Sequence, residues 1–108
     1  MPWKVELLDR SVHDELAELS PEMQARFLRI SELLQTLGPL NVGMPHVRPL
    51  GEKIWEMRLH DRHGIARALY CAVAPQRLVV LHVFSKKTQK TPRSAIKLAR
   101  ARMATIKV

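Results

Sequence analysis

The feature that most constrains this chain is an abrupt change of character inside Leu78–Arg93. The segment begins with the almost continuous apolar run Leu78–Phe84, which is typical of a strand buried on both faces. It continues into Ser85–Thr91, which carries three lysines and no carboxylate. Thr91 and Pro92 then predict a helix start, with Thr91 as the N-cap residue and Pro92 in the first turn. The sequence therefore predicts a rigid strand that delivers cations and hydroxyls to a helix start, where a polyanion could bind.

The distribution of charge agrees with a polyanionic partner. Residues 62–108 carry eleven Lys and Arg and no acidic residue, whereas residues 1–61 carry seven basic and ten acidic residues. The net charge of +8 is therefore concentrated in the second half. Clustered cations favour phosphate-rich partners because binding releases counterions. An anionic membrane surface and plain solubilising charge are the alternatives, and the membrane is disfavoured because no long basic amphipathic helix carries bulky apolar anchors.

Length and composition indicate one domain over residues 1–108 with a modest hydrophobic core. The single cysteine, Cys71, excludes an intrachain disulfide and a cysteine-rich metal site, in agreement with a reducing cytoplasm. We expect a cytoplasmic protein that does not bind membranes, because no apolar run has signal-peptide or membrane-spanning character. The five histidines lack metal-ligand spacing, and no glycine-rich phosphate loop occurs. Neither a metal nor a cofactor is predicted.

The first half of the chain predicts one strand and two helices. Trp3–Leu8 alternates between apolar and polar residues, as a short strand does. Ser11 and Ser20 have the form of helix N-caps, and apolar residues at helical spacing follow each of them. Two short helices joined so closely predict an antiparallel hairpin. Residues 38–53 are rich in proline and glycine, and they predict a loop that crosses the domain.

The second half predicts an antiparallel three-stranded meander and a final helix. Ile54–Leu59 and Ile65–Val73 read as strands that precede the apolar run, with short polar turns between them. His82, inside the apolar run, is expected to be a core histidine bonded to a backbone carbonyl. A short basic helix should follow Pro92. The result is an α+β domain whose helices gather on one side of a small sheet.

Three segments of the second half resemble the HigB branch of the RelE-like toxins, in particular its phage-derived members. They are WEMRL at Trp55–Leu59, GIARALYCAV at Gly64–Val73 and VLHVFSKKTQKTPRSAIKLARARM at Val80–Met103. The heptapeptide KKTQKTP is the most specific motif among them. The resemblance implies a RelE-like domain and a type II toxin that cleaves mRNA on the translating ribosome. It also implies a cognate antitoxin, often of helix-turn-helix type, through which alone operator DNA would be contacted.

Cleavage by attack of a 2′-hydroxyl on the adjacent phosphate needs in-line alignment, charge stabilisation and proton transfer. The resemblance implies that Arg67 contacts the scissile phosphate and that Lys86, Lys87 and Lys90 form the basic site beside it. Arginine suits this role because its guanidinium is permanently ionised and can bind two phosphate oxygens. Arg58, on the adjacent predicted strand, is a further catalytic candidate. We expect Arg67 to be half-exposed, and an outward arginine without a catalytic role is the alternative.

The general base cannot be assigned from the sequence. Some RelE-like members have lysines in the strand around Ile54–Arg58 and a tyrosine after the last strand, and this chain lacks both. Its one tyrosine, Tyr70, lies in a predicted strand and is expected to pack in the core. His60 and His63, in a polar turn, are weaker catalytic candidates because an unperturbed imidazole titrates near neutral pH. Simple solvation of both histidines is the alternative.

Four further cations are candidates for RNA binding: Arg62, Arg93, Lys97 and Arg100. The last three share a basic face of the final helix, which could contact phosphates or could be only a solvated face. The leading hypothesis is a ribosome-dependent mRNA endonuclease. The second is a non-catalytic RNA- or ribosome-binding module on the same scaffold, and the third is a regulatory subunit that acts through a protein partner.

Overall fold

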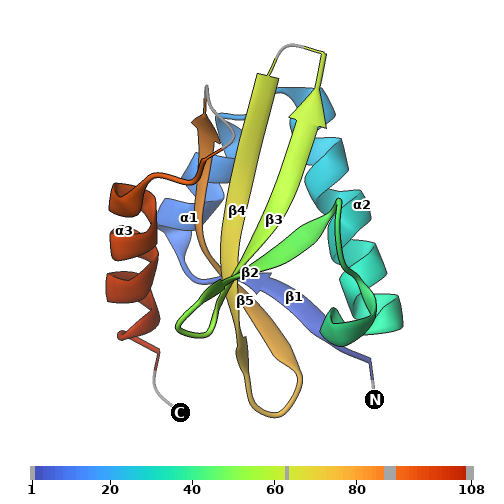
Figure 1. The fold of residues 1–108 in the computed structure, drawn as a ribbon, viewed down its shortest axis with the longest axis vertical. Coiled ribbons are helices and arrows are strands. Elements are labelled where there is room, and N and C mark those ends of the chain that lie inside the picture. The colour runs from blue at the N-terminus through green and yellow to red at the C-terminus, as the bar shows by residue number, and fades with distance from the viewer. Residues whose placement is uncertain (1, 63, 87–89, 107–108) are drawn as a thin grey trace.

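The computed structural model describes residues 2–62, 64–86 and 90–106. Over these residues the chain forms a five-stranded sheet with three α-helices and one short 3-10 helix (Figure 1). The elements are β1 (Lys4–Leu7), α1 (Arg10–Ala17), α2 (Pro21–Leu37), η1 (Pro39–Asn41), β2 (Val47–Gly51), β3 (Ile54–Asp61), β4 (Gly64–Val73), β5 (Arg77–Lys86) and α3 (Arg93–Met103). The strand order is β1-β5-β4-β3-β2, and only the β1–β5 pair is parallel. The α+β class and the β3–β5 meander are confirmed.

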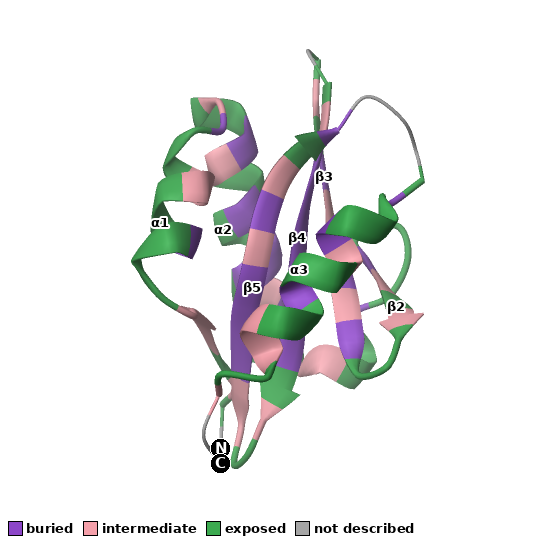
Figure 2. Cartoon of the chain, turned by 90° about the vertical axis from the view of Figure 1, so that its left-hand side faces the viewer, coloured by how far each residue is buried: buried purple, intermediate pink, exposed green. Residues whose placement is uncertain are grey.

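The helices cover both faces of the sheet, so the expectation that they gather on one side is wrong (Figure 2). On one face, Leu34 of α2 lies in a hydrophobic cluster with Met57 of β3. On the other face, Ala99 of α3 lies in a second cluster with Leu69 and Leu81. Successive strand residues point to opposite faces, so the apolar central strands need cover on both. α3 supplies that cover for the second face.

The main departure from the sequence prediction is β2, which lies within the predicted loop 38–53. Val47–Gly51 pairs antiparallel with β3, and Pro49 stands opposite Trp55. The proline is tolerated because β2 is an edge strand, where one backbone N–H is not needed for pairing. Gly51 has a φ of 92°, a left-handed conformation that suits glycine, and the strand register shifts there. Because β2 is rich in turn-forming residues, its composition predicts a loop where the chain forms a strand.

Two of the three predicted helix starts differ in detail. Ser20 is confirmed as the N-cap of α2, where its hydroxyl accepts a backbone N–H at 3.1 Å. The N-cap of α1 is Asp9 and not Ser11, and the Asp9 carboxylate accepts a backbone N–H at 3.2 Å. The prediction of Thr91 as the N-cap of α3 is wrong, because Pro92 occupies that position. The Thr91 side chain is bonded elsewhere, in the candidate site described below.

Past the end of β1, the backbone of β5 bonds to a carboxylate and a guanidinium in place of a neighbouring strand. Glu15 of α1 accepts the Val83 backbone N–H at 3.0 Å, and its Oε1 lies 3.0 Å from Nδ1 of His82. Arg102 of α3 donates to Glu15 at 2.9 Å and to the Leu81 carbonyl at 2.9 Å. The side-chain partner of His82 is therefore a carboxylate and not the expected backbone carbonyl. These bonds satisfy backbone groups that a neighbouring strand would otherwise pair.

Glu15→Gln is expected to lower the free energy of unfolding at pH 7 by about 1–3 kcal/mol, because charge-assisted hydrogen bonds are lost. Burial raises the pKa of Glu15, but bonds from Val83, His82 and Arg102 outweigh it and leave that pKa below its usual value. The stabilisation is therefore present above the unfolded-state pKa and is lost as pH falls through the lowered folded-state pKa. Urea denaturation at pH 7 and at progressively lower pH measures the difference. The gap between wild type and variant should close in acid, and Glu32→Gln, on the exposed side of α2, should show no such gap.

Candidate functional site

Charged side chains gather on the part of the α3-covered sheet face that lies toward the β3–β4 turn. Arg58 of β3, Arg67 of β4 and Phe84 of β5 are partners across three neighbouring strands. Side chains at paired positions of neighbouring strands share one face of the sheet. Lys86, two residues after Phe84, lies on this face as well. The meander therefore brings together basic residues that are far apart in the sequence.

A buried carboxylate, that of Glu56, lies at the centre of these cations. Its Oε1 accepts a hydrogen bond from Nε of Arg48 at 2.9 Å and lies 3.4 Å from Nε of Arg67. Its Oε2 accepts the hydroxyl hydrogen of Thr91. One carboxylate thus ties β2, β3, β4 and the segment before α3 together. We call Arg48, Glu56, Arg58, Arg67 and Lys86 the Glu56 cluster.

Arg67 is 0% exposed, so the expectation of a half-exposed arginine is wrong. Its Nη1 donates to the Ala66 carbonyl at 3.0 Å, and its Nε faces Glu56. Burial lowers the pKa of Arg67, Glu56 raises it, and Arg58 and Arg48 lower it. An arginine keeps its charge at neutral pH despite such shifts. In this conformation Arg67 adds positive potential from behind the surface rather than presenting an atom to a ligand.

Lys86 combines burial with the absence of a bonding partner. Its side chain is 9% exposed, and its Nζ has no hydrogen-bond partner among the described residues. Burial lowers the pKa of Lys86, and Arg67 lowers it further, against an opposing effect of Glu56. A lysine in such surroundings is more easily deprotonated than one in water, as a general base requires. The amine is therefore a candidate for the proton-transfer group that the sequence did not reveal.

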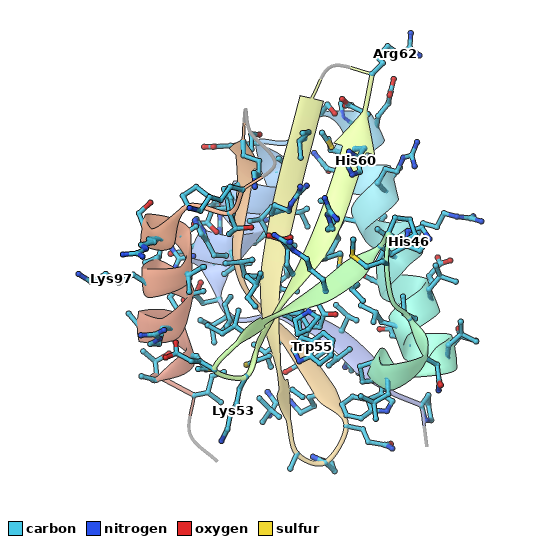
Figure 3. All side chains as sticks on the ribbon, viewed as in Figure 1. His46, Lys53, Trp55, His60, Arg62 and Lys97 are labelled. Atoms are coloured by element: carbon cyan, nitrogen blue, oxygen red, sulfur yellow. The ribbon has the colours of Figure 1, made fainter. Side chains whose placement is uncertain are left out.

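The remaining catalytic candidates differ in their placement. Arg58 is half-buried, and its Nη1 lies 3.6 Å from the sulfur of Met44. His60 is exposed near the end of β3, where partial burial and neighbouring arginines lower its pKa (Figure 3). Lys90 is exposed. Lys87 and His63 lie outside the described residues. Of the predicted catalytic residues that the structure describes, Arg58, Arg67 and Lys86 are thus part of the Glu56 cluster.

The predicted RNA-binding residues are not part of that cluster. Arg62 is exposed beyond the end of β3, where its Nη2 lies 3.5 Å from Oε1 of Glu22 (Figure 3). Arg93, Lys97 and Arg100 are exposed on α3, and Lys97 points outward from that helix (Figure 3). Arg100 forms an ion pair with Glu52. The α3 residues therefore form a separate basic surface.

Sequence reasoning missed two members of the Glu56 cluster. Arg48 lies in β2, the strand within the predicted loop, and Glu56 lies in the strand where some members of the resembling family have lysines. The available signal was that Glu56 stands inside a predicted strand between apolar residues. This position indicates a buried carboxylate, and a buried charge requires partners. Tyr70 is buried in the core as expected.

The cluster holds four cations and one carboxylate, so it suits an anionic ligand such as a phosphate group. Among residues 2–62, 64–86 and 90–106, no group of three or more side chains could hold a metal ion. In the described part of the chain, no helix is long and apolar enough to cross a membrane.

Comparisons with known proteins agree on the type of fold. A family model described as "Phage derived protein Gp49-like (DUF891)" matches residues 14–104. Among solved structures, a chain of the archaeal RelE–RelB complex from Pyrococcus horikoshii matches with a TM-score of 0.57 and 20% identity. That match covers 79% of this chain and 96% of the other. No curated protein matches the sequence. The predicted RelE-like fold is confirmed.

Proposed function

Because this chain belongs to the phage-derived Gp49-like family, which is of the RelE/HigB toxin type, we propose that it is the toxin of a type II toxin–antitoxin pair. Its activity is ribosome-dependent cleavage of mRNA, as in the HigB branch. The observation that carries this proposal is the Glu56 cluster, in which cations outnumber carboxylates on a rigid sheet. Its partner is a cognate antitoxin, as the RelE–RelB complex contains for its own RelE chain. In the same proposal the antitoxin is of helix-turn-helix type, and operator DNA is contacted only through it.

The cluster supports a division of roles in cleavage. Arg58 and Arg48, both partly exposed, bind the scissile phosphate and stabilise the phosphorane charge. Arg67, held behind them by Glu56, adds positive potential and fixes their positions. Lys86 removes the proton from the 2′-hydroxyl. The 2′-oxygen then bonds to phosphorus and the bond to the 5′-oxygen breaks, and the leaving 5′-oxygen takes a proton from water, so that a 2′,3′-cyclic phosphate and a 5′-hydroxyl result.

A specific observation favours the second candidate, the non-catalytic RNA-binding module. Arg67 and Glu56 are both 0% exposed and are paired with each other. A pair of this kind can be purely structural, in which case the surrounding cations bind RNA without cleaving it. The two candidates therefore differ in whether bond cleavage accompanies binding to the ribosome.

The decisive experiment maps the 5′ ends of a defined mRNA by primer extension in a purified translation system. The protein is expected to produce new 5′ ends within codons only when translating ribosomes are present. Reactions without ribosomes, and reactions in which initiation is blocked, are the controls. Absence of new ends, with the protein sedimenting on ribosomes, would support the binding module instead. Absence of both cleavage and ribosome binding would contradict both candidates.

A further inference from the structure

A second group of basic side chains lies beside β3, next to the segment that precedes β2. It lines a pocket of about 150 Å³ between α2, the segment before β2, and β3. The polar wall consists of Arg26 and Arg29 of α2, His46, and Arg58 and His60 of β3. His46 and His60 lie on this side of the sheet (Figure 3). No carboxylate lines the pocket.

The two arginines from α2 differ from most other arginines of the chain. Neither Arg26 nor Arg29 forms an ion pair with any residue that the structure describes. By contrast, carboxylates pair with Arg10, Arg48, Arg62, Arg67, Arg77, Arg100 and Arg102. Cations held close together without a counter-charge repel one another, and a bound anion relieves that repulsion. Arg26 and Arg29 therefore give the pocket the positive charge of an anion-binding site, and no described carboxylate neutralises these two arginines.

The pocket shares Arg58 with the Glu56 cluster. Arg58 lines the pocket and is also the cross-strand partner of Arg67. The pKa of His60 is lowered by burial, then by Arg67, Arg58 and Arg26, so one positive field extends from the cluster to α2. A polyanion that occupies the cluster would therefore reach the pocket with its adjoining charges. An RNA strand has this repeating charge, whereas an isolated acidic side chain of a protein does not.

We propose that the pocket formed by Arg26, Arg29, His46, Arg58 and His60 binds a backbone phosphate of single-stranded RNA, adjoining the phosphate at the Glu56 cluster. The choice of RNA rests on the proposed function. The pocket itself places this phosphate on the α2 side of the sheet. It thereby determines the direction in which the RNA strand leaves the cluster, toward α2 and away from α3.

The test is equilibrium binding of a fluorescent, 2′-O-methylated single-stranded RNA, measured by anisotropy without ribosomes. This RNA lacks the attacking hydroxyl, so binding is separated from cleavage. The double variant Arg26→Gln/Arg29→Gln is expected to bind about tenfold more weakly, since charge-assisted bonds are lost. The slope of log affinity against log salt should become shallower by about 0.7 for each lost phosphate contact. Matched thermal melts check the fold, since both arginines are exposed on α2.

The matched control is Lys4→Gln/Arg10→Gln, which removes the same net charge from exposed positions in β1 and α1. It should retain wild-type affinity within about twofold and the wild-type salt slope. Equal weakening in both double variants would show that only net charge matters, and would overturn the proposal. Wild-type RNA binding by the pocket variant, with weaker antitoxin binding, would assign the pocket to a protein ligand and also overturn it. A failed cleavage assay leaves this binding result intact, so the two proposals fail separately.

Discussion

Glu56→Ala is expected to lower the free energy of unfolding by about 3–5 kcal/mol, because it leaves a buried arginine without its counter-charge. Arg67 and Glu56 are both 0% exposed, and their side chains pair at 3.4 Å. The same change removes the acceptor of the Thr91 hydroxyl and the partner of Arg48. Chemical denaturation at pH 7 measures the effect directly.

Further variants at these positions separate charge from packing. Glu56→Gln should be less destabilising than Glu56→Ala, because its amide oxygen can still accept a hydrogen bond. The double variant Glu56→Leu/Arg67→Leu should recover much of the loss, since an apolar pair can replace a buried ion pair. Glu32→Ala, at an exposed position on α2, should change stability by less than about 0.5 kcal/mol. A loss below about 1 kcal/mol for Glu56→Ala would contradict a central structural role for the carboxylate.

Lys86→Arg is expected to lower the rate of ribosome-dependent cleavage by about 10²–10⁴-fold, the usual contribution of a general base. The substitution keeps the positive charge but removes a group that can lose its proton at working pH. Burial lowers the pKa of Lys86, so the neutral amine forms at a lower pH than in water. The wild-type rate should therefore rise with pH up to this lowered pKa. Single-turnover cleavage measured across pH tests both statements.

Two comparisons make the Lys86 prediction falsifiable. Lys4→Arg, an exposed lysine in β1, should retain the wild-type rate and pH profile. Ribosome binding by the Lys86→Arg variant should be close to wild type, because its charge is unchanged. If that variant instead cleaves at the wild-type rate, Lys86 only neutralises phosphate charge, the role implied by the family resemblance.

Elements with a strong local period were predictable from sequence. The apolar run Leu78–Phe84 lies in β5, beside β4 in the middle of the sheet, and the apolar residues of α2 at helical spacing are buried up to Leu34, whereas Leu37 at its end is exposed. Ser20 caps α2 because its signal depends only on the following three residues. The strand β2 was not predictable in the same way, because pairing with β3 overrides its proline-rich composition. Local patterns succeed where local interactions decide the structure.

Only part of the candidate site could be predicted from local sequence patterns. The sequence placed Arg58, Arg67 and Lys86 on neighbouring strands, and the register of the meander brings them to one face. It could not show that Glu56 would pair with Arg67, because the exposure of a strand residue depends on which elements cover its face. The same applies to the pocket beside α2, whose residues come from three separate elements.

The sequence by itself determined the basic second half, the central apolar strand and the order of the helices and strands other than β2, because composition and periodicity are properties of the chain. The tertiary structure alone decided that α3 covers the second face of the sheet and that Arg67 is buried against Glu56. It also decided that Lys86 has no hydrogen-bond partner among the described residues. Burial and charge pairing depend on contacts between distant segments, and these contacts arise only when the sheet and its helices assemble.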